Sequence, residues 1–390
     1  MNKVKSELRI GILGGGIAGL SCALALRQRA GIEHVCVFES DSRLDLPHRQ
    51  GHGLILMQNG VQALQALGVA ALLDQSTPLK QAFFQDEAGH ILQSDQLDDV
   101  YSVSRLAIIN GLLAALPAES VIYQHRTQQI ELNYQADAVH AVHFQSGDML
   151  HHDDVDLLID ATGVRSPLCQ ALNGDLKRPF SPVKEIVTST YMPELAAQLS
   201  SRFVKTSFAE RGLAFGLLAP TAERVIGFLQ FDSTRYAPPK QQTDIGYFLQ
   251  SVLVDAPQIV RTYLQNADLS TAHVWHPVDA DMLPRWHNRN SIAIGDAAHP
   301  LLPFTSQGVS AALEDSIMLA DAIREMDGET IPQLLTRFSQ KRRAEIRPFI
   351  DGGRKILHHF MEDSAEFVLP YVDGSESALA DHLVQANGRL

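Results

Sequence analysis

A glycine-rich turn between a short apolar strand and an alanine-rich helix is the feature that most constrains this chain of 390 residues. The sequence predicts a buried strand over residues 8–13, a turn over 14–19 and a helix over 20–27. Gly14 permits the tight turn, Gly16 lets backbone approach a pyrophosphate, and Gly19 lets helix pack closely on strand. The free N–H groups where the helix opens, at Ile17 and Ala18, are expected to meet phosphate oxygens. The pattern predicts an α/β fold that binds a dinucleotide.

An acidic residue follows the second predicted strand at the distance that this motif requires. The strand covers residues 34–38 and ends in Glu39, twenty residues after Gly19. At that spacing a carboxylate accepts hydrogen bonds from an adenosine ribose. A lone GxGxxG is weak evidence, but its strand and helix context together with Glu39 makes a strong prediction. The glycine turn by itself leaves the identity of the dinucleotide open.

A second motif, nearly 280 residues later, gives that turn its meaning. Residues 291–294 predict another buried strand, which delivers Gly295-Asp296-Ala297-Ala298-His299-Pro300 at its carboxyl end. Ligands of open α/β sheets bind at that edge. The two motifs together indicate FAD.

The residues after this motif are expected to direct the start of a helix at the flavin. Pro303 stiffens the loop, and Ser306 is expected to cap a helix over residues 309–320. The start of that helix would point the backbone N–H groups of Gly308 and Val309 at the flavin. These groups and the positive helix end would stabilise the negative charge of a reduced flavin.

Four segments resemble, in order and spacing, the class A flavoprotein monooxygenases, the family of para-hydroxybenzoate hydroxylase. They are the glycine turn with Glu39, Ser104-Arg105, Thr162-Gly163 to Ser166, and Gly295 to Gly308, and the resemblance covers residues 8–325. It implies that Asp296 reaches the ribityl or pyrophosphate region of FAD and that Arg105 contacts FAD from a separate segment. Arg49 and His52 would lie where the chain passes the isoalloxazine ring.

The same patterns predict the domain organisation. A Rossmann-like, GR2-type FAD-binding domain comprises residues 1–75, 100–180 and 276–330. An inserted, mostly antiparallel β-sheet domain for the substrate comprises residues 76–99 and 181–275, where short strands alternate with turns. Residues 331–390 are predicted to form a C-terminal helical segment.

The resemblance implies a monooxygenase that forms a flavin C4a-hydroperoxide and hydroxylates an electron-rich, aromatic small molecule with molecular oxygen. The sequence identifies no catalytic acid or base. Candidate residues for the substrate site are aromatic: Phe83, Phe84, Phe203, Phe208, Phe215, Phe228 and Phe231. NAD(P)H is the expected transient electron donor, but Thr162 stands where the family has aspartate, so a separate reductase or the substrate is an open alternative.

Other functions remain open at this point. A flavin halogenase would need a lysine, for which Lys80 is a candidate, but Trp275 and Trp286 form no WxWxIP element. Related flavoproteins reduce isoprenoid double bonds or act on a protein substrate during quinone-cofactor maturation. A noncatalytic assembly protein could dock through the basic stretch Lys341-Arg342-Arg343 together with Arg347, Arg354 and Lys355, although such a run is more often a solvated helix face.

Composition excludes several other classes. The formal net charge of −13 opposes nonspecific binding to nucleic acid or anionic membranes. The three cysteines are far apart and the histidines lack HxH or HExxH spacing, so we expect neither a disulfide framework nor a metal site. No apolar run is long enough for a membrane span, and we expect a cytoplasmic enzyme.

Overall fold

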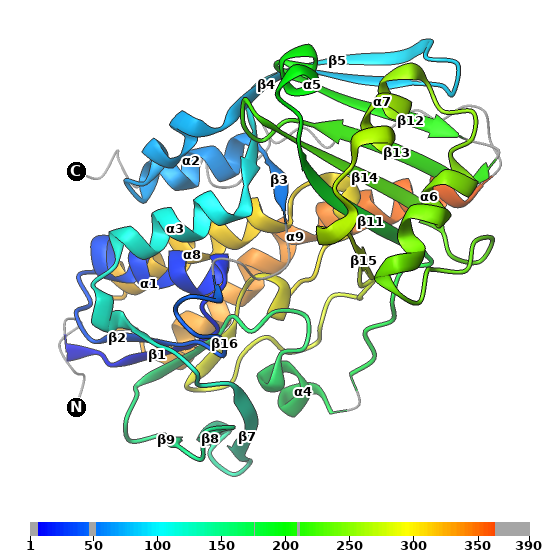
Figure 1. Ribbon diagram of the computed structural model, residues 1–390. Helices are drawn as coiled ribbons and strands as arrows, with labels where there is room; N and C mark the ends of the chain where they lie inside the picture. The colour runs from blue at the N-terminus through cyan, green and yellow to red at the C-terminus, as the bar shows by residue number, and fades with distance from the viewer. Residues whose placement is uncertain (1–6, 47–51, 175, 209–210, 363–390) are drawn as a thin grey trace.

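The computed structural model describes residues 7–46, 52–174, 176–208 and 211–362. It contains two large sheets in different parts of the molecule, one at the lower left and one at the upper right of Figure 1. The predicted fold class is confirmed: a Rossmann-like α/β domain, a mostly antiparallel sheet and C-terminal helical structure.

The first sheet has five parallel strands. Their order is β16 (Ser291–Ala293), β10 (Leu157–Asp160), β1 (Ile10–Leu13), β2 (Val35–Phe38) and β6 (Val121–Ile122). These strands are short and almost wholly buried, as expected where helices cover both faces of a parallel sheet. The helices around it are α1 (Ile17–Ala30), α2 (Gln58–Ala66), α3 (Arg105–Ala115), α4 (Pro167–Asn173) and α8 (Gly308–Arg324).

Helices α1 and α8 pack closely, although they begin far apart in the sequence, at Ile17 and Gly308. Buried serine hydroxyls join them, with Ser21 Oγ 2.7 Å from Ser316 Oγ. Near the other end of α1, Arg29 donates two hydrogen bonds to the carboxylate of Asp321. This pairing brings the starts of the two helices to one region of the parallel sheet.

The second sheet has eight strands, and only the β12–β4 pair is parallel. Their order is β15 (His273–Trp275), β11 (Val183–Tyr191), β14 (Arg224–Asp232), β13 (Leu213–Leu218), β12 (Arg202–Phe208), β4 (Thr77–Gln85), β5 (Ile91–Ser104) and β3 (Gly53–Leu56). Helices α5 (Pro193–Leu199), α6 (Ile245–Val252) and α7 (Gln258–Asn266) cover one face. Strand β3 and the last residues of β5 belong to this sheet, whereas our boundaries assign residues 53–56 and 100–104 to the FAD-binding domain.

This sheet is curled enough for its two edges to meet. His52, which precedes edge strand β3, donates from Nε2 to the carbonyl oxygen of Thr271 at 3.1 Å. Its ring also lies 5.5 Å, between centroids, from that of His273 in the opposite edge strand β15. The face without helices is therefore the inner, concave one.

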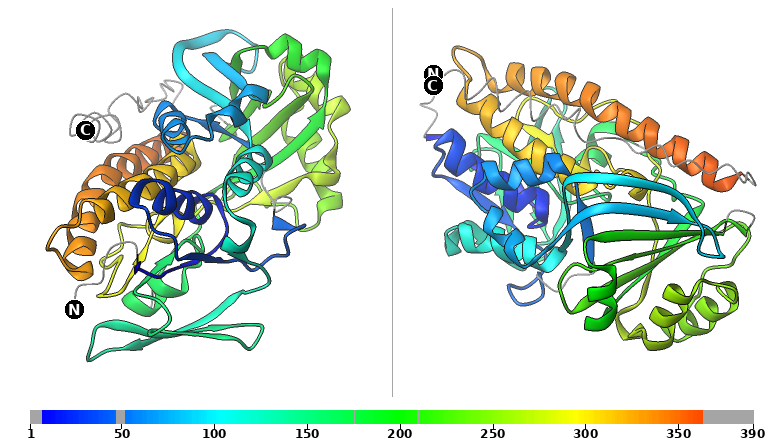
Figure 2. Two further views of the ribbon diagram at one scale, coloured as in Figure 1. Left: turned by 90° about the vertical axis from the view of Figure 1, so that its left-hand side faces the viewer. Right: turned by 90° about the horizontal axis from the view of Figure 1, so that it is seen from above.

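A long helix and a small meander complete the molecule. Helix α9 (Ile331–Met361) runs along much of the molecule (Figure 2). It begins with a capping box, in which the Gln333 side chain accepts a hydrogen bond from the backbone N–H of Thr330. Strands β7 (Thr127–Asn133), β8 (Ala138–Phe144) and β9 (Met149–His151) form the meander. The predicted C-terminal segment extends to residue 390, but residues 363–390 lie outside the described part.

Candidate active site

The carboxyl edge of the parallel sheet gathers the predicted motifs. Leu13 is in register with Phe38 on one side and Asp160 on the other, and Asp160 is in register with Ala293. The next residues along each strand are the glycine turn, Glu39, the Thr162-Gly163 turn and Gly295-Asp296. Segments spread over 280 residues therefore share the edge where α/β folds bind ligands.

The three motif glycines have different surroundings. Gly14 has φ +95°, and a Cβ there would lie 2.7 Å from the carbonyl oxygen of Ala161. A Cβ on Gly19 would collide with the carbonyl oxygen of Gly14, so helix α1 packs directly on the turn. A Cβ on Gly16 would meet nothing within 4 Å. The space beside Gly16 is thus open to a ligand, as phosphate binding requires.

Helix α1 presents its first N–H groups beside that space. Its N-cap is Gly16, and no side chain caps it. Ala18, like Gly14 and Gly16, is partly exposed among buried neighbours, whereas Ile17 is buried. Uncapped N–H groups and the positive helix end are the elements of an anion site.

Glu39 is buried at the end of β2 and faces the glycine turn. Its carboxylate accepts the N–H of Gly15 at 2.6 Å and that of Asp41 at 2.7 Å. These bonds fix the orientation of the carboxylate at the turn. The Ser40 hydroxyl also donates to this carboxylate, at 2.9 Å.

The Gly295-Asp296 turn lies against both helices. Gly295 has φ +57°, and a Cβ there would approach the side chains of Ala18 and Ala312 at 3.1 and 3.3 Å. The Asp296 side chain is exposed, yet desolvation by the surrounding protein raises its pKa, against the opposing influence of His299 and Arg178. A carboxyl group that is accessible but closely surrounded occupies a recess, as a cofactor-binding residue would.

A buried ionic network holds this turn in place. Asp315 of α8 accepts the N–H of Gly295 and the Nε2–H of His299, both at 2.7 Å. Arg342 of α9 donates from Nε to Asp315 at 2.6 Å and from Nη2 to Glu314 at 2.8 Å. Burial alone would raise the pKa of Asp315, but His299 and Arg342 outweigh it and hold the pKa at about 2. The carboxylate thus stays ionised and ties the turn to two helices.

This network corrects one expectation from the sequence. Arg342 is only 1% exposed, so the basic stretch Lys341-Arg342-Arg343 is not simply a solvated helix face. Arg343 also turns inward and donates to the carbonyl oxygens of Leu283 and Pro284. Only Lys341 of the three is exposed, so Arg342 and Arg343 cannot contribute to a basic docking surface, whereas Arg347 and Lys355 are exposed farther along α9.

The start of α8 differs from our expectation. Ser306 does not cap the helix, because Pro303–Thr305 form a short 3-10 turn that leaves Ser306 in the left-handed conformation at φ +54°. The N-cap is Gln307, again without a side-chain cap, and the helix begins at Gly308. Pro303, Gly308 and Val309 are all partly exposed, and a Cβ on Gly308 would meet nothing within 4 Å. The free N–H groups that we predicted are therefore present, one residue from the predicted cap.

Polar atoms around this helix start suit a bound polar ring. Asn59 Nδ2 donates to Gln307 Oε1 at 3.0 Å. Within the described residues, the buried Gln307 Nε2, Thr305 Oγ1 and Ser310 Oγ have no hydrogen-bond partner. Buried polar atoms are normally paired. Together with the open space at Gly16 and Gly308, these unpaired atoms show that the residues fit FAD.

The Thr162-Gly163 turn is held by hydrogen bonds, although it lacks the aspartate of the family pattern. Asp160 accepts the Thr162 hydroxyl at 2.6 Å and the Ser166 hydroxyl at 2.8 Å. Arg178, which the sequence did not single out, donates to the carbonyl oxygens of Val164 and Ala297. It therefore joins the Thr162-Gly163 turn to the Gly295-Asp296 turn and faces Asp296 electrostatically.

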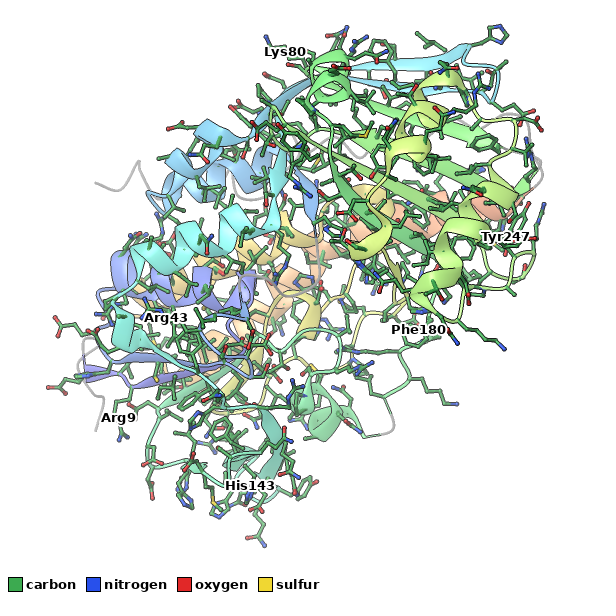
Figure 3. The ribbon with its side chains drawn as sticks, in the orientation of Figure 1. Arg9, Arg43, Lys80, His143, Phe180 and Tyr247 are labelled. Atoms are coloured by element: carbon green, nitrogen blue, oxygen red, sulfur yellow. The ribbon has the colours of Figure 1, made fainter. Side chains whose placement is uncertain are left out.

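The remaining candidates are divided between the two sheets. Arg105 is half-buried and begins α3, next to the end of β5. Arg49 lies outside the described residues. Lys80 is exposed at the outer end of the eight-stranded sheet, far from the parallel sheet (Figure 3), which counts against it as a halogenase lysine. Trp286 is buried beside His299, whereas Trp275 is partly exposed in β15.

The aromatic candidates lie on opposite faces of the eight-stranded sheet. Phe208, Phe215 and Phe231 belong to the core under α5, α6 and α7, so they face away from the FAD-binding domain. Phe84, Phe203 and Phe228 pack on the concave face with Met57 of the FAD-binding side. Only this second group remains in position to contact a substrate between the two sheets.

The described part of the chain offers neither a metal-binding cluster nor a membrane-spanning helix. No group of three or more His, Cys, Asp or Glu side chains there could hold a metal ion. No helix in the same residues is long and apolar enough to cross a membrane.

Comparison with known proteins agrees with this geometry. A 3-amino-4-hydroxybenzoate 2-monooxygenase from Streptomyces platensis is 25% identical, with 98% of this chain and 93% of the relative covered. A 3-hydroxybenzoate 6-hydroxylase from Klebsiella oxytoca is also 25% identical, with 83% and 81% covered. The crystal structure of Klebsiella pneumoniae HpxO with FAD and uric acid superposes with a TM-score of 0.78 at 21% identity, covering 98% of this chain and 93% of that one.

The family model described as FAD binding domain matches residues 7–352, nearly the entire described chain. That match contains the glycine turn, the Asp296 turn and both uncapped helix starts. The chain belongs to this FAD-binding family and is a class A flavoprotein monooxygenase.

Proposed function

We propose that this monooxygenase hydroxylates a small aromatic molecule between the carboxyl edge of the parallel sheet and the concave face of the eight-stranded sheet. One observation carries the proposal most strongly. Two long helices, α1 and α8, begin side by side at that edge, and no side chain caps either of them. One uncapped start suits a pyrophosphate, and the other suits the electron-rich end of a flavin.

Each end of FAD has its own binding residues in this proposal. Gly16 and the start of α1 bind the pyrophosphate, Glu39 accepts from the adenosine ribose, and Asp296 accepts from the ribityl hydroxyls. Gly308 and Val309 direct N–H groups at the ring, where they stabilise negative charge. When bound and reduced, FAD supplies the activation of molecular oxygen, and the protein supplies orientation and a dry site.

The aromatic substrate class rests on the relatives and on the concave face. The two curated relatives cited above are named for hydroxylated benzoates. On the concave face, the stacked rings of Phe203 and Phe228 provide an apolar surface, with centroids 6.1 Å apart. Flat aromatic molecules suit such a surface.

We also propose NAD(P)H as the electron donor, with a protein reductase as the alternative. Thr162 replaces the acid of the family pattern, but Asp160 still orders the turn through the Thr162 hydroxyl. The donor therefore needs a direct test. The three cysteines are unpaired within the described chain, which supports the proposed cytoplasmic location.

Anaerobic mixing of the yellow holoenzyme with NADH or NADPH tests this function. We expect one donor to bleach the visible FAD absorbance, faster when an aromatic acid is present. Asp296→Ala should lose most of its bound FAD during purification, whereas Asp255→Ala, a change at an exposed aspartate of the other domain, should retain it. Stoichiometric FAD in Asp296→Ala would contradict the assigned site, and a flavin that neither donor reduces would favour a partner reductase.

A further inference from the structure

A lysine, a glutamine and a glutamate form a buried polar chain across the eight-stranded sheet. Lys205 Nζ of β12 donates to Gln230 Oε1 of β14 at 2.6 Å. Gln230 Nε2 donates in turn to Glu185 Oε1 of β11 at 2.5 Å. Lys205 is 6% exposed and Glu185 5%, and the mechanism described above uses neither. The two charged side chains come from strands that are not neighbours, and Gln230 bridges them.

This polar chain lies on the concave face. Strand side chains alternate between faces, so the neighbours of each residue fix its direction. Val204 on β12, Leu229 and Phe231 on β14 and Ile186 on β11 all pack under the covering helices. Lys205, Gln230 and Glu185 therefore point the other way, toward the FAD-binding domain.

Apolar contacts with the FAD-binding side flank the chain at both ends. On the concave face, Phe203 and Phe228 pack with Met57, which precedes α2. Val183 and Ala214 pack with Leu302, which directly precedes the Pro303 turn beside the flavin site. The three polar residues lie between these two contacts, so they face the space proposed for the substrate.

The energetics argue against a purely structural role. Within the described residues Lys205 donates one hydrogen bond, although an ammonium group carries three donors. Desolvation lowers the pKa of Lys205 to about 8, against the opposing influence of Glu185, and it raises the pKa of Glu185 to about 7. Apolar side chains of similar volume at such positions are often neutral or stabilising. A ligand that accepts the spare donors would account for keeping a lysine there.

We propose that Lys205 is a specificity-determining residue that binds an anionic oxygen of the aromatic substrate, with Gln230 and Glu185 as positioning residues. A carboxylate and an ionised ring hydroxyl share this chemistry. Either would accept charge-assisted hydrogen bonds from the two free N–H groups of the lysine. The inference rests on the proposed function, because it assumes that the substrate occupies the space between the sheets.

Binding is measured without turnover, by titrating oxidised holoenzyme and following the perturbation of the FAD spectrum. The probes are 3-hydroxybenzoate, which carries a carboxylate, 3-hydroxybenzamide, which is neutral, and 4-nitrophenol, whose hydroxyl is readily ionised. We expect Lys205→Met to weaken binding of the anionic probes about tenfold or more while hardly changing that of the amide. Loss for the benzoate alone identifies a carboxylate site, and loss for the nitrophenol identifies a phenolate site.

Two further variants distinguish the loss of the positive charge at Lys205 from a defect in folding. Lys205→Arg restores a cation and should recover much of the anion binding, which also tests the inference if Lys205→Met folds poorly. Lys184→Met changes a buried lysine that precedes Glu185 on β11 and should leave binding unchanged. The Nζ of Lys184 donates to the carbonyl oxygen of Ser181.

Equal affinities of Lys205→Met and wild type for both anions would overturn the inference. So would equal weakening of the acid and the amide, or the absence of a wild-type response to either anion. Product formation is assayed separately, so anion binding without hydroxylation would refute the proposed function and leave the lysine site standing.

Discussion

Gly16 and Gly19 lie three residues apart in one turn, yet a side chain would have different effects at the two positions. A Cβ on Gly16 meets only open space, whereas a Cβ on Gly19 collides with the carbonyl oxygen of Gly14. Gly16 thus leaves room for the ligand that we propose there, whereas Gly19 allows α1 to pack on the turn. These different surroundings agree with the separate roles that the motif predicts for the two glycines.

Gly16→Ala and Gly19→Ala test this separation. Gly16→Ala should fold with unchanged thermal stability as apoprotein but lose at least tenfold in FAD affinity, because the methyl group occupies the phosphate position. Gly19→Ala should be destabilised even without FAD, since backbone must move. Thermal melts of both apoproteins and FAD titration by flavin fluorescence provide the comparison. A Gly16→Ala protein that binds FAD normally would rule out the assigned phosphate site.

At the scale of elements, α8 and α9 form one unit through Arg342. This guanidinium lies among Asp315, Glu314 and Glu345, and these partners raise its pKa further despite the opposing effect of burial. Asp315 in turn holds the Gly295 turn on which Asp296 lies. Helix α9 therefore supports the turn that carries Asp296, through Arg342 and Asp315.

Removal of the Arg342 guanidinium should destabilise the folded protein. Arg342→Met leaves buried carboxylates without their cation, so we expect a loss of about 3–5 kcal/mol in the free energy of unfolding and weaker FAD retention. Arg347→Met, an exposed position on the same helix, is the control and should change stability little. Urea denaturation of the two variants measures the difference. Similar midpoints for both would show that the network contributes little.

The network also has a predictable pH dependence. The pKa of Asp315 in the folded protein, about 2, is below the ordinary value of an aspartate. Its contribution is therefore fully present above the unfolded pKa and is lost as pH falls through the folded value. Arg342→Met should raise the folded pKa of Asp315 and shrink this contribution. Comparison of melting temperatures between neutral and acidic pH checks the sign.

Local patterns could be predicted from sequence, and contacts between distant segments could not. The strand, glycine turn and helix around Gly16 are set by neighbouring residues, so their positions were predictable. Ser306 is a suitable cap residue by type, but the Pro303–Thr305 turn places it in the left-handed conformation. Lys205 is an isolated lysine in a strand, and its partners come from two other strands.

The roles of Arg342 and Arg178 also depend on contacts between distant segments, so they could not be predicted from sequence. Arg342 stands in a basic run that is typical of a solvated face, while its anionic partners come from α8, 27 and 28 residues earlier. Arg178 gives no local signal, because its partners are carbonyl oxygens in two separate turns. In both cases the tertiary fold supplies the missing information.

At the scale of the whole molecule, the site needs both sheets. The parallel sheet presents the FAD-binding turns, and the curled sheet presents its concave face to them, with α9 running beside both (Figure 2). The contact of Leu302 with Val183 and Ala214 connects the flavin loop to that face directly. Neither sheet alone encloses the space where we place the substrate.

Incorporation of heavy-isotope oxygen into product tests the central claim most directly. Holoenzyme is supplied with NADH or NADPH, a panel of aromatic acids that includes 3-hydroxybenzoate, and isotopically labelled oxygen gas, and products are analysed by mass spectrometry. We expect a hydroxylated aromatic product carrying one labelled oxygen atom. If reduced holoenzyme consumes oxygen but yields only hydrogen peroxide across the panel, or if the product takes its oxygen from water, hydroxylation of aromatic acids is contradicted.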